Sequence, residues 1–282
     1  MASQRPKYAL ITGCGQGGIG EALALEFLRR NVHPIATVLP TESSEHLSSA
    51  GITWFPLDVS SEGSVIALRK SVRELTEGKG LDVLFNNATG YTMPAIDTDV
   101  PSVQRMFDVN LFGPMRMVNH FHDLLIRAKG TVVNMGSIGG IVPYVYGASY
   151  NASKAALAHW TNTLRLTDQI ISGEVSTNIL RNDHGRALPE DSYYAPLASE
   201  FKAHIYRTPE GATDRHTFAT KAVAQALRTS PPSWFWTGSW ATFIWALDTF
   251  FPRRIFDYIL WRMFGLAKLK EAHETSMRAK KN

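Results

Sequence analysis

Tyr150 and Lys154 are the residues of this sequence whose types and spacing could do acid–base chemistry. A separation of four residues places both side chains on one face of a helix, one turn apart. A buried ammonium beside a phenol favours the phenolate, so we expect Lys154 to lower the pKa of Tyr150 toward the working range of a catalyst. A surface Tyr and Lys that happen to stand four apart are the common alternative, so other parts of the chain must decide.

Ser137 supplies a third group, at the end of the apolar run 130–137 that precedes Tyr150. A hydroxyl at the tip of a strand, facing a Tyr/Lys pair, can hold a carbonyl while the Tyr delivers a proton. The three side chains together predict carbonyl chemistry.

A glycine-rich stretch near the N-terminus predicts a phosphate site. Tyr8–Thr12 is typical of a short buried strand and runs directly into Gly13–Gly20, which a helix over about 19–31 follows. Free amides at a helix N-terminus bind pyrophosphate, and glycines let the phosphate come close. The spacing departs from G-x-G-x-x-G, so we interpret the loop as a relative of that dinucleotide-binding fingerprint and not as a turn without a ligand.

The elements that must position these residues alternate along the chain. Further strands are predicted at 34–38, 52–58, 81–85 and 130–137, with helices at 61–76, at 101–129 with a break at Gly113-Pro114, and around Tyr150. This order predicts an α/β fold with a single doubly wound parallel sheet, Rossmann-like, and an aromatic C-terminal extension. We divide the chain into a dinucleotide-binding and catalytic domain, 1–232, and an aromatic and basic segment, 233–282.

Four polar or glycine-rich sites follow predicted strands, namely Gly13–Gly20, Asp58, Asn86–Ala88 and Ser137. The carboxyl ends of parallel strands meet at one edge of the sheet, where ligands bind. We therefore expect these sites to converge.

With these motifs in place, the sequence resembles the short-chain dehydrogenase/reductase family over about residues 7–230. The matching pieces are Thr12-Gly13…Gly18-Ile19-Gly20, Leu57-Asp58-Val59, Asn86-Asn87-Ala88, Asn110 within Asp-Val-Asn-Leu-Phe, Ser137 and Tyr150-x-x-x-Lys154. The resemblance implies carbonyl reduction or alcohol oxidation with a nicotinamide cofactor. The loop with one extra residue and the aromatic C-terminus are similar to a fungal branch related to 1-acyldihydroxyacetone-phosphate reductase.

The resemblance also implies residue roles. Ser137 would polarise the substrate oxygen and Tyr150 would donate the proton. Lys154 would lower the pKa of Tyr150 and hold the nicotinamide ribose, and Asn110 would hold a water that links Lys154 to solvent. Cofactor-binding residues carried over in the same way are Gly13, Gly18, Ile19 and Gly20 at the phosphates, Asp58 at the adenine amine, Asn87 along the adenosine, Tyr150 and Lys154 themselves, Val175, and Thr177 at the nicotinamide carboxamide. We assign no metal site.

The cofactor and the direction of reaction follow from the resemblance alone. The loop after the second strand, Thr37–Ser44, contains no Arg to meet a 2′-phosphate, and its acid, Glu42, lies past Pro40. We expect NADP, with NAD as the open alternative. The substrate is expected to be a small, lipophilic carbonyl compound from lipid or secondary metabolism. Two alternatives stay open, an NAD-dependent alcohol dehydrogenase and a catalytically weak cofactor-binding scaffold.

The scaffold alternative depends on the segment before Gly173. If the helix that carries Tyr150 reaches Asp168, only 169–172 remain for both a loop and a strand, which together need more residues. Either the helix stops near Thr163 or the sixth strand is clipped. We hypothesise a deletion that clips this strand and weakens the nicotinamide end of the site.

Composition limits the partners. The single cysteine, Cys14, excludes an internal disulfide and fits a reducing compartment, and residues 1–7 lack the apolar run of a secretory signal. From residue 252 onward there are eight basic and three acidic residues, while the remainder of the chain is close to neutral. A nucleic-acid-binding stripe is therefore not expected, whereas a basic tail beside aromatic residues favours a membrane surface.

The C-terminal segment supports two interpretations. Residues 233–251 contain four Trp and four Phe, and the uncharged run 234–247 is too short to span a bilayer. Trp next to Arg favours a seat at the membrane interface, on the cytoplasmic side at the endoplasmic reticulum or a lipid droplet. The alternative places Ser233–Thr237 as a seventh strand and packs the rest on the body or on a second subunit of a homo-oligomer, in the cytosol.

Overall fold

The fold is a single parallel sheet between two layers of helices. The computed structural model describes residues 5–87, 92–164, 167–179, 183–207 and 210–279. Seven parallel strands form the sheet in the order β3-β2-β1-β4-β5-β6-β9. The strands are β1 (Tyr8–Ile11), β2 (His33–Val38), β3 (Thr53–Pro56), β4 (Val83–Asn86), β5 (Thr131–Met135), β6 (Thr167–Ser172) and β9 (Trp234–Thr237). The expected doubly wound, Rossmann-like architecture is confirmed.

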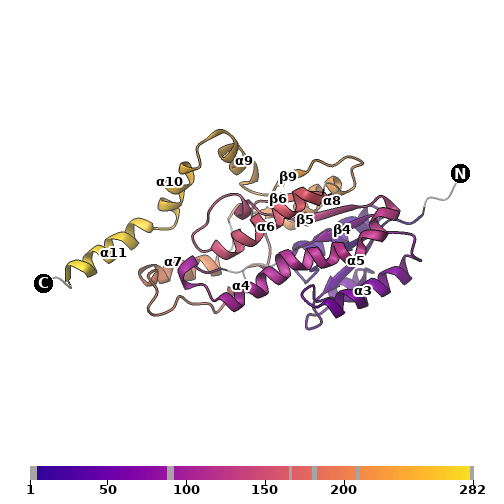
Figure 1. Ribbon diagram of the computed structural model, residues 1–282, viewed down its shortest axis with the longest axis horizontal. Helices are drawn as coiled ribbons and strands as arrows, with labels where there is room; N and C mark the ends of the chain where they lie inside the picture. The colour runs from indigo at the N-terminus through magenta and orange to yellow at the C-terminus, as the bar shows by residue number, and fades with distance from the viewer. Residues whose placement is uncertain (1–4, 88–91, 165–166, 180–182, 208–209, 280–282) are drawn as a thin grey trace.

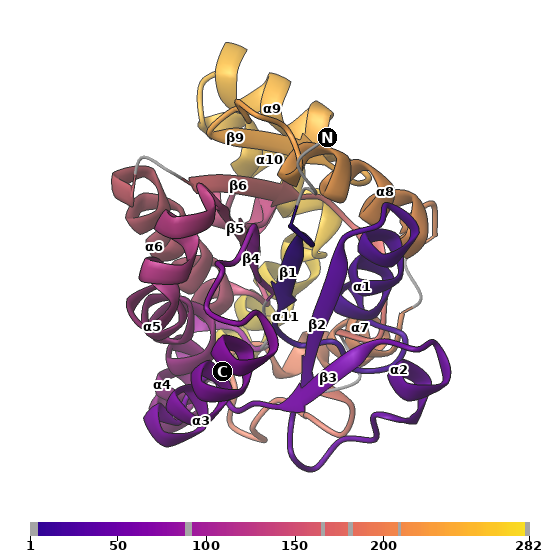
Figure 2. The ribbon, with the colours of Figure 1, turned by 90° about the vertical axis from the view of Figure 1, so that its right-hand side faces the viewer.

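Helices cover both faces of the sheet (Figure 2). One face carries α1 (Ile19–Arg29), α2 (Glu45–Ser49) and α8 (Arg215–Ala226), and the other carries α3 (Glu62–Leu75), α4 (Val100–Phe107), α5 (Gly113–Ala128) and α6 (Ala148–Leu164). Strand side chains alternate between the two layers, so Ala9 and Ile11 join the core under α1 and α8 while Leu10 joins the core under α3 and α5. Continuous apolar strands are the pattern that a sheet buried on both faces requires.

The order of the strands places a crevice between β1 and β4. The chain moves outward in one direction through β2 and β3, and in the other through β4, β5, β6 and β9. The carboxyl ends of β1 and β4 are therefore a topological switch point, where open α/β sheets bind ligands.

The expected break in the helical region 101–129 is confirmed. The chain leaves α4 through a π-helical segment, η2 (Asp108–Phe112), and α5 begins at Gly113 with Pro114 in its first turn. A π segment inside an α-helical run commonly marks a functional site, and here it carries Asn110.

The sixth strand corrects the expectation of a clipped segment. Strand β6 has six residues and pairs with β5 on one side and β9 on the other, with Val133 beside Asp168 and Ile170 beside Phe235. Helix α6 ends at Leu164, and residues 165–166 lie outside the described ranges. The first alternative, a helix that stops near Thr163, therefore holds. The idea that a deletion clips this strand is wrong, because a very short connection leaves room for it.

The remaining elements follow β6 along the chain. Strand β9 confirms the alternative in which 233–237 contains a seventh strand. The segment 174–215 contains the short parallel pair β7 (Val175–Ser176) and β8 (Thr213–Asp214) and the helix α7 (Ala198–Tyr206). Sequence reasoning missed α7, whose Phe201 and Ile205 stand four apart and are buried.

Three helices follow β9 and form a C-terminal arm. They are α9 (Ala241–Phe250), α10 (Arg254–Met263) and α11 (Leu266–Ala279), and Figure 1 shows them passing from the edge of the sheet away from the body. Within the described ranges, no helix combines the length and the apolar composition needed to cross a membrane.

Candidate active site

A cleft of about 460 Å³ opens at the carboxyl edge of the sheet. It joins most of the residues that the sequence singled out, although they come from loops far apart in the chain. Those that line it are Gly13, Gly18, Ile19, Asp58, Asn87, Ser137, Tyr150, Lys154, Val175 and Thr177. Gly20 and Asn110 lie behind this lining, both buried.

The glycine loop is built for close backbone approach. Gly13 has φ of +69°, and a Cβ at Gly20 would lie 2.3 Å from the carbonyl oxygen of Gly13. Only glycine at position 20 lets the start of α1 pack this closely on the loop. Gly18 caps α1 without a side-chain hydrogen bond, and Gly18 and Ile19 at the start of the helix line the cleft. This arrangement fits a pyrophosphate.

Asn87 ties the two sides of the switch point together. Its side chain donates to the carbonyl oxygen of Gly13 at 3.1 Å, and its backbone N–H donates to the hydroxyl of Thr12 at 3.0 Å. Asn87 therefore fixes the glycine loop from β4 as well as lining the cleft. Ala88, the last residue of the quoted motif, lies outside the described residues.

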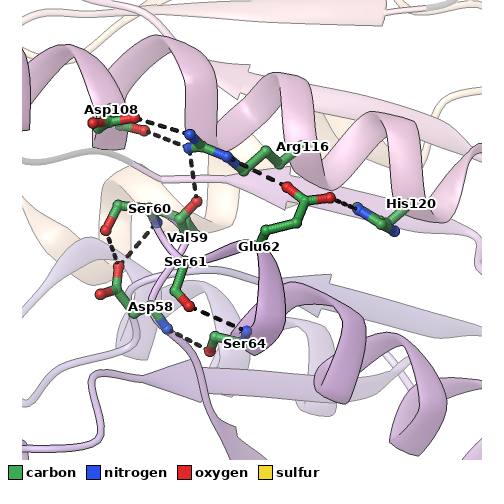
Figure 3. Close-up of polar contacts among 9 residues, drawn as sticks. All are labelled: Asp58, Val59, Ser60, Ser61, Glu62, Ser64, Asp108, Arg116 and His120. Atoms are coloured by element: carbon green, nitrogen blue, oxygen red, sulfur yellow. Dashed lines mark hydrogen bonds and ion pairs between the residues drawn. The ribbon is translucent and has the colours of Figure 1, made fainter.

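Asp58 lies in a turn that α5 holds in place (Figure 3). Its carboxylate accepts from the backbone N–H and the hydroxyl of Ser60, at 2.9 and 2.6 Å. Arg116 donates to the carbonyl oxygen of Val59 at 3.3 Å and pairs with Asp108 at 2.9 Å (Figure 3). The turn is thus bonded to the helix pair that carries Asn110. An adenine contact by Asp58 stays a prediction.

Ser137 and Tyr150 meet at the deep end of the cleft. Ser137 follows β5 and caps the short helix η3 (Ile138–Gly140), where its hydroxyl accepts from the backbone N–H of Gly139 at 3.0 Å. Tyr150 lies in the first turn of α6 and lines the cleft together with Ser137. Lys154, one turn later, is 1% exposed and its Nζ lies 5.7 Å from the centre of the Tyr150 ring.

The pKa shifts differ from the sequence expectation. Burial raises the pKa of Tyr150, and the nearby Ser137 hydroxyl only partly opposes that rise. Burial lowers the pKa of Lys154 from 10.5 to about 7, and its Nζ donates to the carbonyl oxygen of Met135 at 2.7 Å. The prediction that Lys154 lowers the pKa of Tyr150 is therefore wrong for this state, because removal of water dominates both groups. Tyr150 stays a neutral phenol at neutral pH.

Asn110 contacts α6 between Tyr150 and Lys154. It is fully buried in η2, and its Nδ2 donates to the hydroxyl of Ser153 at 3.1 Å, which in turn donates to the carbonyl oxygen of Tyr150 at 2.8 Å. Asn110 thereby holds the turn of α6 that separates Tyr150 from Lys154. Its role in holding a water stays a prediction.

Several lining residues were not foreseen. Arg207 and Glu174 form an ion pair at the cleft, and Asn178 donates to the carbonyl oxygen of Gln16 at 3.1 Å, above the glycine loop. Glu174 directly precedes Val175, and Asn178 directly follows Thr177. Their polar side chains beside two expected cofactor-binding residues could have marked them as lining the cleft. Arg207 follows α7, an element that the sequence analysis did not identify.

Glu42 reaches the cleft from the loop after β2. A Cβ placed on Gly15 would lie 3.2 Å from its carboxylate, which also accepts from the backbone N–H of Leu39 at 3.4 Å. Among the described lining residues, the basic side chains are Lys154, which lies beside Tyr150, and Arg207, which pairs with Glu174. The end of the cleft beside β2 therefore carries an acid and no cation.

Comparison with known proteins identifies the family and agrees with the fold. The family model for short chain dehydrogenases matches residues 7–178. A short-chain dehydrogenase from Neurospora crassa, srdE, is 64% identical over 289 positions, with 99% of each chain covered. That aligned length exceeds the 282 residues of this chain, so the alignment contains gaps here. An NADPH-dependent 1-acyldihydroxyacetone phosphate reductase from Schizosaccharomyces pombe is 42% identical over 67% of this chain and 68% of its own.

The fold also matches a solved structure. A short-chain dehydrogenase from Streptomyces avermitilis superposes with a TM-score of 0.73 at 21% identity, covering 98% of this chain and 99% of its own. The chain belongs to the short chain dehydrogenase family, whose members are oxidoreductases that bind a nicotinamide cofactor. The glycine cradle and the uncapped start of α1 fit the pyrophosphate of such a cofactor.

Proposed function

We propose that the protein reduces a ketone to a secondary alcohol with NADPH, with Tyr150 as the proton donor and a lipophilic lipid or secondary-metabolite ketone as substrate. One observation carries the proposal. Tyr150, Ser137 and Lys154 line the same cleft as the glycine loop. An acid–base group and a dinucleotide site in one cleft are the parts that carbonyl reduction needs.

The bound cofactor supplies a hydride to the carbonyl carbon. Ser137 holds the carbonyl oxygen by a hydrogen bond, and Tyr150 gives its phenolic proton to that oxygen as the C–O double bond becomes single. Tyr150 is a neutral phenol at neutral pH and so carries the proton that reduction consumes. Lys154, with a pKa of about 7, can return a proton to the site near neutral pH.

The test compares Tyr150→Phe with Tyr146→Phe on a panel of ketones with NADPH. Tyr146 is a matched control, since its buried hydroxyl has no hydrogen-bond partner among the described residues and does not line the cleft. We expect Tyr150→Phe to lose about 10²- to 10⁴-fold in turnover and Tyr146→Phe to stay close to wild type. Equal rates for wild type and Tyr150→Phe would refute the proton donor.

The name of the S. pombe relative supports NADPH as the cofactor. Glu42 favours a second candidate, an NAD-dependent alcohol dehydrogenase, because a carboxylate at the β2 end of the cleft can bind a ribose hydroxyl and repels a phosphate. The intact β6 removes the reason for a third candidate, the inactive scaffold.

Fluorescence titration separates the two cofactors. NADPH and NADH are titrated into wild type, Glu42→Gln and Glu45→Gln, the last being a nearby acid that does not line the cleft. If NADPH is the cofactor, it binds more tightly than NADH to wild type, and Glu42→Gln tightens it further. Tighter NADH binding that Glu42→Gln weakens would replace the first candidate with the second.

A further inference from the structure

The C-terminal arm exposes more large apolar side chains than any other stretch of the described chain. Eight lie between residues 240 and 263, among them Phe250 at 71% exposure. The set is Trp240, Phe243, Trp245, Phe250, Phe251, Tyr258, Trp261 and Met263. Clustered exposure of this kind marks an interaction surface, whereas single exposed apolar residues do not.

Helix α10 places arginines among these aromatics. Arg254, Tyr258, Trp261 and Arg262 stand at i, i+4, i+7 and i+8, so they share one exposed face. The guanidinium of Arg262 lies 6.0 Å from the centre of the Tyr258 ring and donates to its hydroxyl at 3.1 Å. The opposite face of α10 carries Phe256, which is buried. The helix therefore turns its aromatic and cationic face outward.

The arm has little protein against its outer side. Helix α9 packs mainly on β9 and α10 mainly on α11, and Figure 1 shows both helices at the margin of the molecule. Their charged residues are Arg253, Arg254 and Arg262 against Asp248 and Asp257, and the chain from residue 252 onward has an excess of basic residues. Aromatic side chains with adjacent arginines are the composition of helices that lie in a bilayer interface.

We propose that the exposed faces of α9 and α10 seat the protein on an anionic membrane surface. Trp and Phe enter the boundary between head groups and acyl chains, while Arg254 and Arg262 meet lipid phosphates and other acidic head groups. A second copy of this chain fits less well. A two-fold interface sets the same patch against itself, and with Arg254 and Arg262 beside the single acid Asp257 the two copies would meet with an excess of positive charge.

The arm is also joined to the loop between Ser137 and Tyr150. Arg253, which starts α10, donates to the carbonyl oxygen of Ile141. Phe264, between α10 and α11, packs edge-on against Tyr144 and Tyr146, with ring centres 4.8 and 5.2 Å apart. A membrane that holds the arm therefore lies close to the catalytic loop, which suits delivery of lipophilic molecules to the cleft.

Vesicle co-sedimentation of the full chain tests the proposal without any measurement of turnover. Vesicles of phosphatidylcholine, with and without phosphatidylserine, are mixed with wild type and with the double variant Phe250→Ser/Trp261→Ser. The matched control is Val100→Ser/Ile126→Ser, which removes two side chains of similar exposure from the body. Arg254→Gln/Arg262→Gln removes charge while keeping the aromatics. Circular dichroism establishes that each variant is folded.

We expect wild type and the control to bind vesicles that contain phosphatidylserine. The aromatic variant should bind these vesicles at least about tenfold more weakly. The arginine variant should lose about fivefold in affinity per arginine, and only on vesicles that contain phosphatidylserine. Absence of vesicle binding by wild type would overturn the proposal. In that case, sedimentation velocity without vesicles tests for a second copy. A wild-type dimer that the aromatic variant cannot form would assign the surface to dimerisation. Equal binding by all four proteins would overturn it as well.

Discussion

The catalytic cleft and the C-terminal arm depart from ordinary burial in opposite directions. In the cleft a lysine, Lys154, is 1% exposed, whereas at the start of the arm a tryptophan, Trp240, is 60% exposed. Lysine is rarely buried fully, and large apolar side chains rarely cluster in water. Each departure costs free energy that the rest of the fold must offset, so each marks a place where function and not stability selects the side chain.

The two regions also differ in what holds them. The cleft is assembled from the ends of strands and lies between packed helices, so its geometry depends on the whole sheet. The arm is continuous in sequence and meets the body at a few places, among them Arg253 and Phe264. A change in the cleft should therefore alter chemistry and folding together, while a change on the outer side of the arm should leave both intact.

Lys154→Met tests the cleft side of the comparison and has the largest expected effect. Turnover should fall about 10²- to 10⁴-fold, because the variant removes the titrating group beside Tyr150. The wild-type free energy of unfolding should rise between pH 7 and 9, by at most about 1.4 kcal/mol per pH unit. In this range Lys154 is protonated in the unfolded chain, where its pKa is near 10.5. In the folded protein its pKa is about 7, so it has released that proton. Urea titrations at several pH values measure this slope.

The rise of the unfolding free energy with pH should end near pH 9 because of Cys14. Burial raises the pKa of its thiol from 9.0 to about 12, so above pH 9 the unfolded chain loses a proton that the folded protein keeps, which offsets the contribution of Lys154 and levels the wild-type stability. Lys154→Met should remove the rise between pH 7 and 9 and turn the level region above pH 9 into a fall. A variant that keeps the full rise would show that Lys154 does not carry a depressed pKa.

Phe264→Ala and Met263→Ala test whether the arm has one anchored side and one free side. Phe264 is 6% exposed between Tyr144 and Tyr146, whereas Met263 is 65% exposed. Loss of the phenyl ring should cost about 3–5 kcal/mol of unfolding free energy, and loss of the exposed thioether less than about 0.5 kcal/mol. Urea denaturation followed by tryptophan fluorescence gives both values. Equal costs would mean that the arm has no preferred face.

The sequence predicted much of the cleft because each motif that lines it is a short stretch that can be recognised without knowing the rest of the fold. Gly13–Gly20, Asn87, Ser137 and Tyr150 each stand at a strand end or helix start that periodicity locates, and the parallel sheet brings those ends together. What it did not predict depends on contacts between distant elements. Arg207 reaches the cleft only because α7 folds over it, and the pKa of Tyr150 depends on how much water packing removes.

The sixth strand shows a different limit. A count of residues predicted that either α6 or β6 must be shortened, and it could not decide between them. The chain lacks some positions present in its Neurospora relative, yet wherever those positions lie, they do not remove β6. Pairing with both β5 and β9 stabilises the strand, which a count of residues cannot register.

Gly20→Ala against Gly63→Ala sharpens the comparison at the contact between the glycine loop and the start of α1. A methyl group on Gly20 would stand 2.3 Å from the backbone oxygen of Gly13, whereas a methyl on Gly63, in the first turn of α3, meets nothing within 4 Å. The first change should cost about 1–3 kcal/mol of unfolding free energy and weaken cofactor binding about tenfold, because the start of α1 must move off the glycine loop. The second should be neutral or stabilise by up to about 1 kcal/mol. Thermal denaturation and cofactor fluorescence measure both, and unchanged cofactor affinity in Gly20→Ala would show that the loop does not hold the phosphates.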